Sequence, residues 1–269
     1  MMQAGIHASY ETLQIEEPGP GLLLVRLNRP EVANAMSTQL GRDMIDVFTR
    51  LSHEPDSYRC VILTAAGERH FCAGADLKER KGMTDADWHK QHHLFERMML
   101  AIVDCPIPVV AAVNGVAYAG GCELVLCCDF AYAVETARFA LTETRIGIMP
   151  GGGGTQLLPR AVGLRRAKEM ILSATPVSAQ NALDWGLVNQ LSKPGEVLND
   201  ALAIARAICV NAPLSVRQAK RSMELGMRMD LRTGMFFEID AYNRLVPTED
   251  RREGVLAFNE GRTPNFKGR

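Results

Sequence analysis

Cys-x-x-Cys motifs and membrane-spanning apolar runs are missing from this sequence, and we expect no targeting segment. Its seven cysteines are odd in number, lack Cys-x-x-Cys spacing and lie mostly in apolar stretches, a pattern that indicates reduced, buried thiols. No run of about 18 apolar residues could cross a bilayer. The segment 1–15 has neither an apolar signal core nor an arginine-rich amphipathic presequence. We therefore expect a soluble, cytoplasmic protein.

An excess of charge of either sign is missing too. The 30 Lys and Arg residues nearly balance 31 Asp and Glu residues, which leaves a net charge of -1. A dedicated binder of nucleic acids or membrane surfaces would carry a basic patch, so neither is expected as a partner. With 269 residues, 47% of them hydrophobic, the chain can bury a sizeable core without disulfides or metal ions. Overall composition therefore indicates no partner, and only local motifs can do so.

Strand and helix patterns alternate along the chain up to about residue 190. Two strands, 13–16 and 22–27, flank the turn-forming sequence Pro-Gly-Pro-Gly, which predicts a hairpin. Further strands are expected at 60–64, 109–113 and 130–134, and helices at 38–51, 85–103 and 122–128. This alternating order predicts an α/β fold whose parallel strands are joined by crossover helices.

The pattern changes after Pro194, where only helices are expected. These helices are predicted at 195–210, 213–225, 231–246 and 251–258. We therefore divide the chain near residue 195, into a core of residues 1–195 that carries the site and a helical region of residues 196–269. The helical region would cover a contact between subunits.

Two carboxylates stand beside glycine-rich turns. Glu123 follows a strand and a glycine turn and falls in the first turn of an apolar helix, where the helix dipole alone would favour it by about 0.3–1 kcal/mol. Glu143 comes just before the four glycines at 151–154, and by itself it would pass for a surface acid. In apolar surroundings, however, burial can raise the pKa of at least one of them, so the pair suits acid and base work.

A third motif, His70 to Lys78, places small residues directly after an expected strand, where backbone N–H groups would be exposed. It could be merely a tight turn. A second free N–H, that of Gly120 at a helix start, would complete a two-donor oxyanion hole, usually the largest single catalytic contribution in chemistry that passes through an enolate.

Other kinds of site are disfavoured. The four glycines are followed by Thr155 and Gln156, so they form neither a Walker loop nor a dinucleotide fingerprint. His89 and His93 have the spacing of a helical metal site, but a solvated helix face with His92 explains them better, and no metal is expected. No Gly-x-Ser-x-Gly elbow and no cysteine in basic surroundings is present, which disfavours covalent catalysis.

Taken together, these motifs resemble the crotonase superfamily, whose type member is enoyl-CoA hydratase. The resemblance covers nearly the whole chain. It is carried by Leu27 to Pro30, Asn34 to Met36, Phe71 to Lys78, Asn114-Gly115, Gly120 to Glu123, Glu143, Pro150 to Gln156 and the ending Phe258 to Lys267.

The resemblance implies a repeated ββα spiral core with an all-α C-terminal region, assembled as homotrimers or homohexamers. It also implies an acyl-CoA thioester substrate of the kind found in fatty acid metabolism, with no separate cofactor, because coenzyme A is part of that substrate. Carried over by position, the amides of Ala75 and Gly120 would hold the thioester oxygen. The other substrate-binding positions implied are Ala73, Asp76, Leu77, Lys78 and Gly151.

In the same resemblance Glu123 would activate a water molecule, Glu143 would supply the proton to Cα, and the Gly151 N–H would orient the water. Superfamily members that lack one or both glutamates catalyse isomerisation, dehalogenation or acyl hydrolysis instead, so the presence of both favours a hydratase. Methylglutaconyl-CoA hydratase and enoyl-CoA isomerase stay open as alternatives. The RNA-binding hydratase branch has a lysine-rich first helix, whereas this chain has Thr38, Arg42 and Asp46 there, too little charge to engage phosphates.

One departure from the family lies near the C-terminus. The type enzyme has Glu-Lys-Arg after the phenylalanine that matches Phe258, and its phosphate-binding Lys corresponds to Gly261 here. Coenzyme A still carries a 3′-phosphate that a cation should meet. We therefore expect Arg262 or Lys267, from the same or a neighbouring subunit, to take this role, with Lys78 as the alternative.

Overall fold

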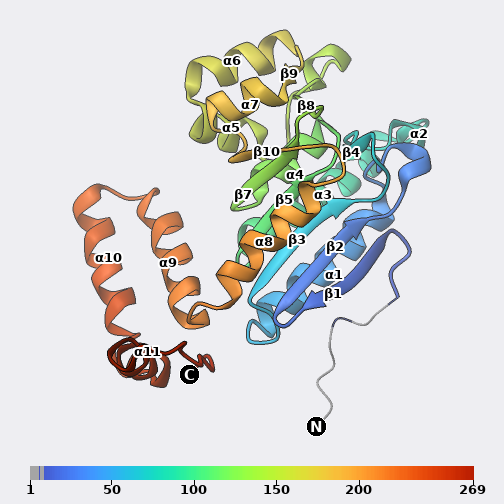
Figure 1. Cartoon of the computed structure of the whole chain (residues 1–269). Helices are drawn as coiled ribbons and strands as arrows, with labels where there is room; N and C mark the ends of the chain where they lie inside the picture. Colours follow the sequence, from blue (N-terminus) through green and yellow to red (C-terminus); the bar gives the residue numbers. More distant parts are fainter. Residues whose placement is uncertain (1–5, 7–8) are drawn as a thin grey trace.

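Two β-sheets form the centre of the computed structural model, which describes residue 6 and residues 9–269 (Figure 1). The larger, six-stranded sheet has the order β1-β2-β3-β5-β7-β10 and the four-stranded sheet the order β4-β6-β8-β9. The larger sheet contains β1 (Leu13–Gly19), β2 (Leu22–Leu27), β3 (Cys60–Ala65), β5 (Val109–Val113), β7 (Phe130–Val134) and β10 (Gln190–Ser192). The smaller contains β4 (His70–Cys72), β6 (Val116–Tyr118), β8 (Arg138–Ala140) and β9 (Val177–Ser178). β1 and β2 form the predicted antiparallel hairpin, and the larger sheet is parallel from β2 onward.

Three consecutive pairs of strands form the repeating unit of the fold. In the pairs β3 and β4, β5 and β6, and β7 and β8, the first strand joins the larger sheet and the second joins the smaller one. A longer helix comes after each pair: α3 (Asp85–Val103), α4 (Gly120–Cys127) and α5 (Gly154–Val162). This repetition is a ββα spiral, so the predicted α/β fold class is confirmed.

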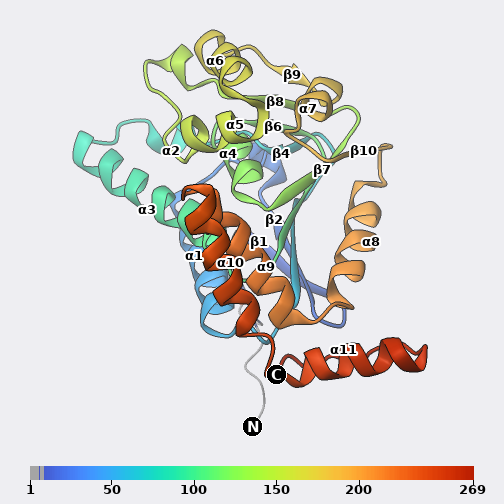
Figure 2. The same cartoon turned by 90° about the vertical axis from the view of Figure 1, so that its left-hand side faces the viewer.

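Helix α1 (Thr38–His53) shows how the sequence pattern specifies these elements. Ser37 caps it, because its hydroxyl accepts a hydrogen bond from the N–H of Leu40. Its buried apolar side chains recur at helical spacing: Leu40, Met44, Val47, Phe48 and Leu51. They join the main core beside α3 (Figure 2). Burial of each such side chain contributes about 1.5–3 kcal/mol, which fixes the helix against the sheet.

Several short elements are absent from the sequence-based prediction. The strands of the smaller sheet have two or three residues each, too few for an alternating pattern to stand out. The helical elements missed in this way are η1 (Pro30–Val32), α2 (Leu77–Arg80), η2 (Glu143–Ile146), α5, α6 (Leu164–Ser173) and α7 (Ala179–Trp185). Tertiary packing, more than local propensity, stabilises elements of this length.

The helices predicted after Pro194 are present as α8 (Val197–Cys209), α9 (Pro213–Gly226), α10 (Leu231–Asn243) and α11 (Glu249–Glu260). α8 packs on the outer face of the larger sheet, where a second apolar cluster forms. On β2, Leu22 and Leu24 face α8, whereas Leu23 and Val25 face the main core, as the two-residue period of a strand requires. α8 is therefore part of the core, although it follows residue 195. The division into two domains stays a prediction.

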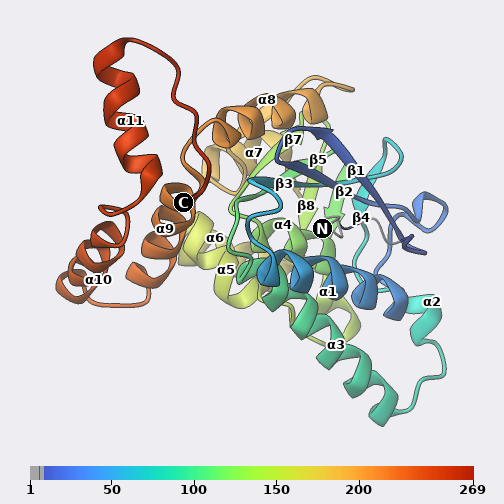
Figure 3. The same ribbon diagram turned by 90° about the horizontal axis from the view of Figure 1, so that it is seen from below.

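Helices α9, α10 and α11 stand apart from the sheets (Figures 1 and 3). They expose large apolar side chains: Met223, Met227, Leu231, Met235, Phe236 and Phe258. Within the described residues no single helix is long and apolar enough to cross a membrane; α8 and α9 pass that test as a pair but are bent by 107° at their junction.

Candidate active site

The smaller sheet brings the predicted motifs together. β4, β6 and β8 are parallel neighbours, so the segments that leave their carboxyl ends lie side by side. The segment after β4 carries Ala75, the one after β6 carries Gly120 and Glu123, and the one after β8 carries Glu143. Ligands of α/β proteins bind at this end of parallel strands, because the chain turns there and leaves backbone groups open.

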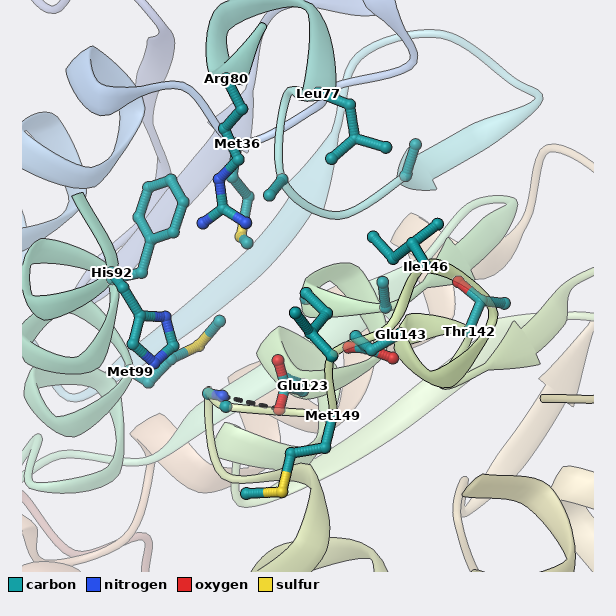
Figure 4. Close-up of a pocket in the computed structure, with 18 residues that line it drawn as sticks. Met36, Leu77, Arg80, His92, Met99, Glu123, Thr142, Glu143, Ile146 and Met149 are labelled. Carbon is teal, nitrogen blue, oxygen red and sulfur yellow. Dashed lines mark hydrogen bonds between the residues drawn. The ribbon is translucent and has the colours of Figure 1, made fainter. Parts of the chain in front are cut away.

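A cavity of about 150 Å³ lies between these segments (Figure 4). Most of the predicted site residues line it: Ala73, Ala75, Leu77, Gly120, Glu123, Glu143 and Gly151. Asp76 and Lys78 lie instead in an adjoining groove that shares Ala73, Ala75 and Leu77 with the cavity. Asp76 caps α2 by accepting hydrogen bonds from the N–H groups of Lys78 and Glu79, and it pairs with Arg29 at 3.1 Å. Its substrate contact stays a prediction.

The Ala75 and Gly120 turns touch each other. Gly74 has φ 91°, and a Cβ there would lie 2.7 Å from the Cβ of Ala119 and 3.2 Å from the nitrogen of Gly120. Ala119 itself has a positive φ of 50°, a strained backbone conformation for a non-glycine residue, at the point where the chain enters α4. Within the described part of the chain, neither the Ala75 N–H nor the Gly120 N–H donates to a protein acceptor. Both are thus free at the cavity wall.

Glu123 is held by the four-glycine segment. Glu123 as a whole is 4% exposed, and its Oε1 accepts hydrogen bonds from the N–H groups of Gly152 (2.8 Å) and Gly154 (2.9 Å). A Cβ at Gly152 would lie 2.7 Å from Oε2, so a larger residue there would displace the carboxylate. Burial raises the pKa of Glu123, and the two N–H groups oppose that rise by stabilising the ionised form. The prediction named Gly151 in this segment and missed Gly152 and Gly154.

Glu143 begins η2 and is 7% exposed. Its Oε2 is buried and has no hydrogen-bond partner among the described residues. Burial raises the pKa of Glu143 to about 7, and the charge of Glu123 adds to the rise. A carboxyl that keeps its proton near neutral pH can act as an acid, whereas Glu123 has backbone donors that favour its charged form. The two environments therefore differ in the way that a paired acid and base require.

The cavity is also lined by residues for which the sequence predicted no role in the site. They are Met36, Arg80, His92, Phe95, Met99, Ile146, Ile148 and Met149. Of the three histidines expected on a solvated helix face, His89 and His93 are exposed, as expected, whereas His92 is only partly exposed and also lines the cavity. A Cβ at Gly151 would lie 2.5 Å from Cε1 of His92. His92, Phe95 and Met99 lie on one face of α3, a spacing that could have indicated them. Among the described residues no His, Cys, Asp and Glu side chains cluster as a metal site.

Replacing Glu143 by Gln is expected to stabilise the fold at high pH. The carboxyl is protonated in both states below about pH 4.5; between that value and about 7 the unfolded state ionises while the folded state keeps its proton, so stability falls as pH rises. Glutamine does not ionise, so the variant avoids this loss of folding stability, which is about 1.4 kcal/mol per unit of pKa difference between the folded and unfolded states.

Thermal unfolding at pH 5.5 and pH 8.5 measures the effect. Glu143→Gln should unfold at a higher temperature than the unaltered protein, and this difference in Tm should be larger at pH 8.5. The exposed Glu135→Gln should show no such pH-dependent difference in Tm. An advantage that is independent of pH would contradict the raised pKa of Glu143.

The chain is similar to proteins that share one family description. Its residues 17–269 match the family model described as enoyl-CoA hydratase/isomerase. A short-chain-enoyl-CoA hydratase of Clostridium acetobutylicum is 39% identical over 247 residues, 91% of this chain and 94% of that protein. The human mitochondrial methylglutaconyl-CoA hydratase is 36% identical over 258 residues, 94% of this chain and 76% of that protein. The crystal structure of an enoyl-CoA hydratase from Bacillus anthracis superposes with a TM-score of 0.94 at 42% identity, covering 96% of this chain and 100% of that one.

Proposed function

This chain belongs to the enoyl-CoA hydratase/isomerase family, and we propose that it acts there as a hydratase, with Glu123 as base and Glu143 as acid. The reaction adds water across the 2,3 double bond of a 2-enoyl-CoA thioester. One observation carries the assignment: two buried carboxylates with different environments share a cavity with two free backbone N–H groups.

The first requirement of this reaction is a place for negative charge. When the oxygen of water bonds to C3, the electrons of the double bond move toward the carbonyl, and the thioester oxygen becomes an enolate oxygen. The N–H groups of Ala75 and Gly120 would donate to that oxygen. Because their positions are fixed by the contact between Gly74 and Ala119, no reorganisation is needed as the charge develops.

The second requirement is a balanced pair of proton transfers. Glu123 accepts a proton from the attacking water through Oε2, since Oε1 is occupied by the two glycine amides. Glu143 gives its proton to C2 as the enolate collapses. Glu123 ends protonated and Glu143 ionised, and proton exchange with solvent restores both. The Gly151 N–H, on the cavity wall, would orient the attacking water.

The remaining properties of the protein follow as parts of this proposal. Coenzyme A enters with the substrate, so no other cofactor is needed. The apolar side chains exposed on α9, α10 and α11 suit burial against a second copy of the chain, which supports a homotrimer or homohexamer. With a net charge of -1, nucleic acids and membranes are not proposed as partners, and we propose a cytoplasmic location.

A panel of thioesters tests the function. Short, long, branched and carboxylated 2-enoyl-CoA substrates should lose the absorbance of the conjugated thioester as water adds. Loss with at least one of them supports a hydratase, and the carboxylated member tests the methylglutaconyl-CoA hydratase alternative. A 3-enoyl-CoA that gains this absorbance, with no hydration of any 2-enoyl-CoA, would point to an isomerase instead.

The cation that meets the 3′-phosphate of coenzyme A gives a further prediction. Arg262 is held by Glu253 at 2.7 Å and by Glu260 at 2.6 Å, whereas Lys267 lies in the same groove and forms no ion pair with a described residue. We expect Lys267→Ala to raise KM for acyl-CoA several-fold, about 1 kcal/mol, with Arg262→Ala having the smaller effect. The tail that carries Lys267 is hydrogen-bonded to Asp250 on α11, and α11 lies far from α2, whose residues line the catalytic cavity (Figure 1). The phosphate that Lys267 meets would therefore belong to a substrate bound by a neighbouring subunit.

Steady-state kinetics at low and high salt checks this. kcat should be nearly unchanged, and high salt should shrink the KM difference because the contact is exposed. The control is Arg269→Ala, a charge that pairs with Glu249. A fall in kcat at constant KM would instead mean that this tail positions the active site or the oligomer.

A further inference from the structure

Arg80 is a buried cation in the wall of the catalytic cavity. It ends α2, is 8% exposed, and lines the same cavity as Glu123 and Glu143. In Figure 4 its guanidinium points into the cavity from the side opposite the two glutamates. Since the proposed mechanism uses the glutamates and two backbone amides, it leaves this charge without a role.

The Arg80 side chain is held firmly in place. Its Nε donates to Oε1 of Gln91 at 2.7 Å, and its guanidinium lies 4.1 Å from the ring centre of Trp88 and 5.6 Å from that of Phe95. Gln91 is fixed in turn, because its Nε2 donates to Thr38 at 2.8 Å and to Glu79 at 3.1 Å. A guanidinium anchored in this way presents its terminal nitrogens in one direction.

Those terminal nitrogens have no acceptor in the described part of the chain. Only the Nε of Arg80 forms a hydrogen bond, and no carboxylate of a described residue lies within 4.0 Å of the guanidinium. Glu79, its neighbour in sequence, accepts hydrogen bonds from the N–H of Thr38 and from Nε2 of Gln91 instead. Burial lowers the pKa of Arg80, yet a guanidinium keeps its proton. A buried, unpaired charge is costly, and an anion supplied by a ligand would relieve that cost.

We propose that Arg80 binds a carboxylate at the far end of the acyl group, an inference that rests on the proposed hydratase function. With the thioester oxygen at Ala75 and Gly120, the acyl chain would run past Met36 and Met99 toward Arg80. A planar guanidinium matches a carboxylate with two parallel hydrogen bonds. A cavity of about 150 Å³ is the size that holds benzene, so the acyl group is short. The substrate class is thus the CoA monothioester of a short unsaturated dicarboxylic acid.

A matched pair of substrates tests this. Glutaconyl-CoA and 2-pentenoyl-CoA have the same five-carbon chain and differ in whether its end is a carboxylate or a methyl group. We expect the unaltered protein to hydrate glutaconyl-CoA with a kcat/KM at least about tenfold higher. Arg80→Met should lower that ratio by about tenfold to a hundredfold, mostly through KM, and Arg80→Lys should fall between the two. Arg97→Met, an exposed arginine on α3, is the control and should leave the ratio unchanged.

A binding measurement separates failure of this inference from failure of the proposed function. Calorimetry with the saturated thioesters glutaryl-CoA and valeryl-CoA needs no turnover, and glutaryl-CoA should bind more tightly in an Arg80-dependent way. Hydration of 2-pentenoyl-CoA with no preference for glutaconyl-CoA overturns the Arg80 inference and leaves the hydratase function standing. If Arg80→Met lowers kcat/KM equally for both substrates, Arg80 has a structural role, and the inference of a carboxylate site is overturned as well. If neither thioester is hydrated but glutaryl-CoA binds through Arg80, the carboxylate site stands and the hydratase function fails.

Discussion

Replacing Glu123 by Gln is expected to lower kcat at least about 100-fold while the protein folds normally. A glutamine carbonyl can still accept the two hydrogen bonds from Gly152 and Gly154, so the local structure should survive. What is lost is the carboxylate that removes a proton from water. Steady-state kinetics with a 2-enoyl-CoA measures the loss, and circular dichroism checks the fold.

Glu143→Gln should cause a loss of similar size for the complementary reason, because its amide cannot donate an acidic proton to C2. The two glutamates act on one water and one product, so the double variant should lose much less than the product of the single losses. The surface variant Glu135→Gln is the control for loss of a charge. Near-normal hydration by either single variant would contradict the role assigned to that glutamate. If the fold-loss in kcat of the double variant equals the product of the two single fold-losses, the two glutamates act independently.

Gly120→Val is expected to abolish turnover by closing the oxyanion end of the cavity. A Cβ at Gly120 would lie 2.2 Å from Cε of Met36, which also lines the cavity, so the valine and the displaced methionine would compete with the thioester for space. The Gly120 N–H would then be unable to reach the thioester oxygen. Loss of one such donor alone costs about 100-fold to 1000-fold in kcat, and the steric block should add a large rise in KM.

The matched control for this variant is Gly19→Val at the end of β1, where the nearest atom to an added Cβ is Cδ1 of Leu22 at 3.7 Å. Both variants should show similar thermal unfolding if the effect at Gly120 is confined to the cavity, since Met36 is an unbranched side chain that can move. Normal binding and turnover by Gly120→Val would place the oxyanion hole elsewhere in the chain and would show that the motif has been aligned wrongly.

Elements with a strong local pattern could be predicted from the sequence alone. The helix 85–103 and the strands 109–113 and 130–134 agree with α3, β5 and β7 because each is a run with a clear period or an unbroken apolar core. The smaller sheet could not be predicted, because its strands are too short to carry a period and exist through pairing with one another. The helix α8 could be predicted from its own pattern, but its packing against the larger sheet could not.

For the site, the sequence by itself determined the chemical groups: two carboxylates, small residues after strands, and glycines where backbone must come close. Only the tertiary structure decided which of these groups meet. It joined Gly74 to Ala119, placed the amides of Gly152 and Gly154 on Glu123, and turned Arg80 and His92 toward the cavity. The physical reason is that local pattern reports which face of an element is apolar, whereas hydrogen bonds, cavities and pKa values depend on atoms from segments far apart in the chain, whose distances are set when the whole core packs.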